Sequence, residues 1–237
     1  MAFIRVKHCD FEETYTAFGG DTFQENEWND DSRIDDNTWK QRYDYEGGIV
    51  NSIIEESDSK TILEIGSGPG TLCDTIFKLR NDELTYHMLD KKYAKVSHQK
   101  RNYPGEIFVN DLNGGINSEP LLDSGYDLII CNDVLEHLAN PTQIVQQLYH
   151  LNTGKGKFFV SIPNWRMGHQ MTYRGMWDYD NFLYFMAIHG YEVESVVGSP
   201  LITPDYPKLD SEECLDDSML RSWNWYFVFG KDFDFVK

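Results

Sequence analysis

An apolar run breaks into three alternating glycines in residues 61–70, with the sequence TILEIGSGPG. The run over 61–65 predicts a buried strand, and the amphipathic stretch 71–80 that follows at once predicts a helix. Glycine lets the backbone approach a ligand that a Cβ would exclude, and the first amides of the helix then face that ligand. The stretch therefore predicts a strand–loop–helix unit that binds a nucleotide.

The glycine spacing and one acidic residue indicate which kind of nucleotide. The dinucleotide fingerprint is G-x-G-x-x-G, but here the glycines lie at 66, 68 and 70, and Thr71 stands where the third glycine would be. Glu64, at the end of the strand, would repel a pyrophosphate and suits a ligand with an ammonium or sulfonium group. An NAD-dependent oxidoreductase is therefore disfavoured.

Strand and helix patterns alternate along most of the chain, which predicts a parallel sheet with helices on both faces. The last two strands are expected to form a hairpin-like pair. The expected strands are 61–65, 85–89, 106–109, 126–131, 156–162, 191–197 and 224–229, and the expected helices are 43–56, 71–80, 91–101, 141–151 and 178–189.

The residues at the strand ends resemble class I S-adenosylmethionine-dependent methyltransferases. Residues 64–70 are similar to motif I of that family, and similar segments follow in order at 86–90, 108–112, 126–138 and 157–164. The resemblance implies an α/β fold with a Rossmann-like, doubly wound, seven-stranded sheet whose last strand is antiparallel. It also implies S-adenosylmethionine as the cofactor. Around 126–138 the chain resembles ubiquinone-biosynthesis O-methyltransferases and small-RNA 3′-end methyltransferases.

The same resemblance implies a set of cofactor contacts at the carboxyl ends of the strands, where open α/β sheets bind ligands. A carboxylate suits the ribose because it offers acceptor oxygens to both hydroxyls. The implied contacts are Glu64, Gly66, Gly68 and Asn132 at the methionine part, Asp90 at the ribose, and Asp111 with the Leu112 backbone at the adenine.

Asp133, Glu136 and His137 have the i, i+3, i+4 spacing that places side chains on one face of a helical turn. We expect a capping box, in which Asp133 caps the helix and Glu136 reaches back to its amide. The alternative is a divalent metal site, which the two similar families hold here, with His169 as a remote fourth ligand. We expect no required metal ion. His137 is the candidate general base, although in-line methyl transfer gains mostly from alignment.

The 237 residues suffice for one domain, expected over 46–237, behind an acidic and aromatic N-terminal cap at 1–45. Long connections are expected at 165–177 and 198–223. Arg42 is expected just before the first helix, as a surface residue or as a partner of the cofactor carboxylate.

A formal net charge of -18 repels phosphate backbones and argues against broad nucleic-acid binding. The four cysteines form no C-x-x-C pair, and no apolar run resembles a signal sequence or a membrane span, so we expect a soluble cytoplasmic protein. The sequence leaves the oligomeric state open. The expected function is methyl transfer to a small-molecule acceptor; the alternatives are an RNA-end or protein methyltransferase and a non-catalytic partner subunit that binds the cofactor.

Overall fold

The computed structural model describes residues 37–80, 84–91, 106–164, 178–199, 222 and 224–231. Most of the expected cap, the expected helix 91–101 and most of the two long connections lie outside these residues, as does His169. Within the described residues, no helix is long and apolar enough to cross a membrane.

One seven-stranded sheet forms the centre of the molecule, in the order β3-β2-β1-β4-β5-β7-β6. Its strands pair in parallel except β7, which runs antiparallel to both β5 and β6. The expected α/β fold, with its antiparallel last strand, is confirmed. The strands are β1 (Thr61–Ile65), β2 (Thr85–Asp90), β3 (Glu106–Val109), β4 (Tyr126–Asn132), β5 (Asn152–Pro163), β6 (Tyr191–Gly198) and β7 (Asn224–Lys231).

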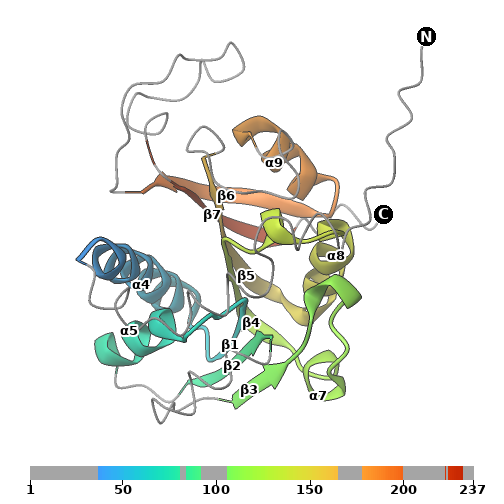
Figure 1. Ribbon diagram of the computed structural model, residues 1–237, viewed down its shortest axis with the longest axis horizontal. Helices are drawn as coiled ribbons and strands as arrows, with labels where there is room; N and C mark the ends of the chain where they lie inside the picture. Colours follow the sequence, from blue (N-terminus) through green and yellow to red (C-terminus); the bar gives the residue numbers. More distant parts are fainter. Residues whose placement is uncertain are drawn as a thin grey trace, which may run out of the picture.

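Helices cover both faces of the sheet (Figure 1), and each face has its own apolar cluster beneath the helices. On one face α4 and α5 pack on the sheet through residues such as Val50, Ile54 and Ile76. On the other face α8 and α9 contribute Ile144, Leu148 and Phe182 to a larger cluster. The α-helices are α4 (Asn37–Ser57), α5 (Thr71–Leu79), α7 (Glu119–Leu122), α8 (Pro141–Leu151) and α9 (Tyr179–Ala187).

Two elements begin earlier than their sequence patterns predict. Helix α4 starts at Asn37 rather than 43, so it runs continuously across the boundary expected between cap and domain. Strand β5 starts at Asn152 rather than 156, because Asn152 pairs with Tyr126 ahead of an irregularity in the β4–β5 register. The exposed Lys155 and the glycines around it carry no apolar alternation, so that extension has no pattern in the sequence.

The strand order reverses between β1 and β4, and the parallel pairing of these two strands places their carboxyl ends side by side. Ile65 of β1 pairs with Cys131 of β4, so the glycine loop leaves the sheet beside Asn132. Asp90 ends β2, the neighbour of β1 on its other side. In open α/β sheets this switch point is where ligands bind.

Candidate cofactor site

The glycine loop adopts a conformation that side chains would obstruct. Gly66, Gly68 and Gly70 have φ angles of 66°, 52° and 79°, in the left-handed region that glycine enters without strain. A Cβ added at Gly66 would overlap the side chain of Val134, which follows β4. The Gly66 amide donates to the carbonyl of Leu89 at 2.8 Å, so the loop is tied to β2.

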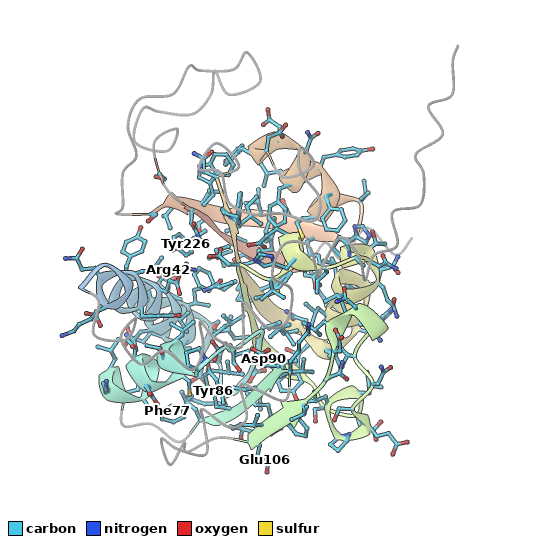
Figure 2. All side chains as sticks on the ribbon, viewed as in Figure 1. Arg42, Phe77, Tyr86, Asp90, Glu106 and Tyr226 are labelled. Atoms are coloured by element: carbon cyan, nitrogen blue, oxygen red, sulfur yellow. The ribbon has the colours of Figure 1, made fainter. Side chains whose placement is uncertain are left out.

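Asp90 lies at the end of β2 (Figure 2). Its side chain binds the backbone of the glycine loop at Gly68. Its Oδ2 accepts a hydrogen bond from the Gly68 amide at 2.6 Å, and its Oδ1 accepts one from the Lys91 amide at 2.6 Å. Burial raises the pKa of Asp90 to about 6, although the Lys91 and Gly68 amides favour the charged form. Each oxygen has a second lone pair that can accept from a ribose hydroxyl.

Glu64 is 5% exposed and points to the face of β1 that α4 and α5 cover. The Tyr86 hydroxyl donates to its Oε2 at 2.9 Å. Burial raises the pKa of Glu64 to about 8; the Tyr86 bond lowers it, and Glu46, Asp90 and Asp74 raise it further. A cation placed beside Glu64 would stabilise its charged form.

Asp111 and Leu112 lie in the 3₁₀ turn η1 (Leu112–Gly114) that follows β3. Asp111 caps this turn, because its Oδ1 accepts a hydrogen bond from the Asn113 amide at 3.0 Å. Leu112 is buried, and the loop behind it is fastened to α8 by the Ile116 amide, which donates to Gln147 at 2.8 Å. The turn and its exposed acid are thus held at the same edge of the sheet as Asp90.

Asn132 ends β4 with both polar atoms of its side chain buried. Among the described residues neither Oδ1 nor Nδ2 has a hydrogen-bond partner. An unpaired buried amide costs about 1–3 kcal/mol, so such groups are usually satisfied by a ligand, water or ion. The amide lies across from Gly66 in the β1–β4 register, where the implied methionine part would bind. With the positive-φ glycines, this unpaired amide makes the site fit the implied cofactor.

The capping box expected after β4 is wrong. The segment forms a 3₁₀ turn, η2 (Leu135–His137), whose N-cap is Val134 without a side-chain hydrogen bond. Asp133 has φ 52°, and its amide donates to the carbonyl of Ser161 rather than to Glu136. Its side chain instead contacts Ser161, Asn224 and Arg42, which meet at the carboxyl end of β4.

Arg42 lies inside α4, not before it, and is only 12% exposed, so its expected place on the surface is also wrong. Its Nη2 is 2.6 Å from Asp133 Oδ2, and its Nε is 2.7 Å from Glu46 Oε1. Burial lowers the pKa of Arg42, but Asp133 and Glu46 raise it by more, so it lies well above its usual value. Tyr226 of β7 donates to Glu46 at 2.9 Å beside Arg42 (Figure 2).

His137 is 32% exposed at the end of η2, with Nε2 3.7 Å from Glu136 Oε1. Glu136 is fully buried, and burial followed by the charge of Asp133 raises its pKa well above the usual value. In the part of the chain that the structure describes, no three His, Cys, Asp or Glu side chains are grouped to hold a metal ion.

Several polar residues of this site were missed by the sequence analysis. They are spread over α4, β2, β5 and β7, and the packing of α4 on the sheet together with the strand register brings them together. A lone serine in the apolar run 158–162 was the one local signal. The missed residues are Glu46, Tyr86, Ser161, Asn224 and Tyr226.

Comparison with known proteins settles the family. Residues 39–193, more than half of the chain, match a family described as a methyltransferase domain. The chain belongs to the methyltransferase-domain family. The matched range begins within α4 and ends in β6, so it includes the carboxyl ends of β1 to β5.

Relatives of this methyltransferase domain occur in mycobacteria. A "probable S-adenosylmethionine-dependent methyltransferase" of Mycolicibacterium smegmatis is 27% identical over 130 residues, which cover 55% of this chain and 47% of the relative. One of the same description from Mycobacterium tuberculosis is 24% identical over 129 residues, covering 54% of this chain and 44% of the relative. The matched part spans about half the length of these relatives.

Solved structures share the fold of this methyltransferase domain at low sequence identity. The plantazolicin methyltransferase BamL, in complex with a triazolic desmethylPZN analog and SAH, has a TM-score of 0.64 and 13% identity over 93% of this chain and 94% of BamL. The N-methyltransferase NodS from Bradyrhizobium japonicum, in complex with S-adenosyl-L-homocysteine, has a TM-score of 0.60 and 15% identity over 88% and 96% of the two chains.

Proposed function

We propose that this chain transfers a methyl group from S-adenosylmethionine to a small-molecule acceptor. The observation that carries the proposal is the Gly68–Asp90 bond across the glycine loop, which presents a carboxylate at the β1–β4 switch point of a methyltransferase-domain fold. The bound cofactor supplies an electrophilic methyl group on a sulfonium. The protein's own task is to hold it in line with the acceptor, which can supply most of the acceleration.

The proposed cofactor contacts follow the strand ends. Asp90 accepts from the ribose hydroxyls, and Asp111 with the Leu112 backbone contacts the adenine. Glu64 and the unpaired amide of Asn132 serve the amino-acid part beside Gly66 and Gly68. Arg42, the buried cation of α4, is the proposed partner of the cofactor carboxylate, since a guanidinium can share its donors among several carboxylates.

A small-molecule acceptor is supported by two features. BamL was solved with a small-molecule analog and NodS is named an N-methyltransferase, and both share this fold. The net charge of -18 also opposes binding of a phosphate backbone. His137 is the proposed base for acceptors that must lose a proton. Methylation of an RNA end or a protein, and a non-catalytic cofactor-binding subunit, remain alternative outcomes of an acceptor screen.

Ligand binding tests the cofactor assignment directly. S-adenosylhomocysteine should raise the melting temperature and bind in calorimetry, whereas NAD should do neither. Asp90→Ala should weaken binding by about tenfold or more, because it removes charge-assisted hydrogen bonds worth roughly 1.5–3 kcal/mol each. NAD binding without S-adenosylhomocysteine binding would overturn the proposal.

A further inference from the structure

Four side chains from four elements meet at the carboxyl end of β4, and we name them the Asp133 clasp: Arg42, Asp133, Ser161 and Asn224. Asp133 Oδ1 accepts from Ser161 Oγ at 2.8 Å and from Asn224 Nδ2 at 2.7 Å. Asp133 Oδ2 faces Arg42 Nη2 at 2.6 Å. The carboxylate of Asp133 is therefore engaged at both oxygens, and it joins α4, β4, β5 and β7.

The backbone at Asp133 is strained in a way that this clasp can maintain. Its φ of 52° lies in the left-handed region, which a non-glycine residue enters at a cost of about 1 kcal/mol or more. Such a conformation persists when the surrounding structure over-determines it. Three side-chain bonds and the bond from the Asp133 amide to the Ser161 carbonyl supply that constraint.

Asp133, the strained residue, lies between Asn132 at the end of β4 and the turn that leads to His137. Before it lies Asn132, whose side-chain amide has no partner among the described residues. After it comes the turn closed by the bond from the His137 amide to the Val134 carbonyl at 3.0 Å. Val134 occupies the space above Gly66 that a Cβ would need. A change of φ at Asp133 would therefore shift Val134 relative to the glycine loop. It would also reorient His137, because both residues belong to the same turn.

We propose that Asp133 is a positioning residue, whose clasp to Arg42, Ser161 and Asn224 holds the turn from Asn132 to His137 in register with the glycine loop. This inference rests on the proposed function, because the register matters for cofactor binding. In this proposal both oxygens of Asp133 are taken up by protein partners rather than by the cofactor or acceptor. It acts through Val134 on the loop and through Arg42 on the placement of α4.

Charge is essential to the clasp. Arg42 lies between Asp133 and Glu46, and neutralising Asp133 removes one of the two acids that face this buried guanidinium among the described residues. Asn at 133 has the same size and tolerates the left-handed region. Its Nδ2 can donate to Ser161 Oγ or to the side-chain oxygen of Asn224 once these groups rotate, so the substitution removes only the charge that faces Arg42. Asp133→Asn therefore weakens the clasp at Arg42 without changing volume or backbone preference.

The matched control lies at the other end of the same strand. Asp127 Oδ2 accepts from the Lys60 amide at 3.0 Å, the Thr61 amide at 3.0 Å and Thr61 Oγ1 at 2.9 Å. Asp127→Asn disrupts a comparable set of bonds far from the switch point. It should lower the melting temperature and leave the cofactor site intact.

Two measurements on the full chain test the proposal. We expect Asp133→Asn to bind S-adenosylhomocysteine about tenfold more weakly, as expected when one charge-assisted interaction is lost. Without ligand, the amides of residues 134–138 should exchange hydrogen faster than in the unmodified protein. Asp127→Asn should change neither. Equal affinity and equal exchange in the two variants would overturn the proposal.

A second variant covers the possibility that Asp133→Asn does not fold. Ser161→Ala removes one bond to Asp133 Oδ1 and leaves every charge in place, so a smaller change in the same direction is expected in both measurements; no change would again overturn the proposal. If the unmodified protein does not bind S-adenosylhomocysteine, the proposed function fails, while hydrogen exchange at 134–138 still decides whether the clasp holds the turn.

Discussion

At the scale of single residues, Glu64 departs far from the usual behaviour of its type. Burial and the neighbouring acids raise the pKa of its carboxyl from 4.5 to about 8, although the bond from Tyr86 lowers it. The free protein therefore holds a proton on Glu64 at neutral pH. The sequence placed this acid at the strand end correctly, but its protonation depends on α4 and β2, which pack against it.

The raised pKa of Glu64 predicts a particular pH dependence of stability. Between about 4.5 and 8 the native state binds more protons at this residue than the unfolded chain, so its contribution to stability falls as the pH rises through that window. Glu64→Gln keeps an acceptor for Tyr86 and cannot ionise. Its melting temperature relative to the unmodified protein should therefore increase from pH 5 to pH 9.

Asp127 provides a control of opposite sign for this titration. Burial raises the pKa of Asp127, but bonds from Lys60 and Thr61 lower it by more, so folding lowers it overall. The stability that Asp127 contributes is lost as the pH falls, and Asp127→Asn should be most harmful at neutral and high pH. If the difference in melting temperature between Glu64→Gln and the unmodified protein does not change with pH, the assignment of a buried, protonated Glu64 is wrong.

At the scale of elements, α4 contains adjacent glycines with different surroundings. A Cβ at Gly47 would lie 2.6 Å from Thr75 Cγ2 of α5, whereas a Cβ at Gly48 would meet nothing within 4 Å. Gly47 thus lets α4 and α5 approach closely over the apolar cluster beneath them. Gly48 has no comparable neighbour.

This difference predicts opposite effects of the same substitution. Gly48→Ala should raise the free energy of unfolding by about 0.5–1 kcal/mol, because alanine favours the helix. Gly47→Ala should lower it by about 1–3 kcal/mol, because the new methyl group overpacks the α4–α5 contact. Denaturant unfolding measures the free energy of unfolding of both variants. Equal changes in the two variants would show that α4 and α5 do not meet at Gly47.

The element pattern was largely predictable from sequence because it is local. Helix α8 begins with Asn140 as cap and Pro141 in the first turn, and strand β3 covers 106–109, both as expected. The early starts of α4 and β5 were not predictable. Each extension is polar or glycine-rich and is fixed by partners elsewhere, such as Tyr126 for the start of β5.

At the scale of the whole molecule, the chain's acids do not assemble a metal centre in the part that the structure describes. Asp133 is engaged by the clasp, and although His137 Nε2 lies 3.7 Å from Glu136 Oε1, the described residues form no group of three that could hold a metal ion. We predict that dialysis against a strong chelator leaves S-adenosylhomocysteine binding unchanged. Calorimetry with and without added magnesium or manganese measures this, and metal-dependent affinity would favour the alternative metal site.

The sequence by itself determined the order of strands and helices, the glycine loop and the polar residues at the strand ends. These follow from short-range patterns, since burial period and turn residues are properties of neighbouring positions. Only the tertiary structure decided the state of Glu64, the buried place of Arg42 and the partners of Asp133. Those partners, Ser161 and Asn224 among them, are far apart along the chain, and the register of β4, β5 and β7 brings them to one point. An aspartate after a strand can cap the next turn or bind distant side chains, and here the deciding partners come from α4, β5 and β7.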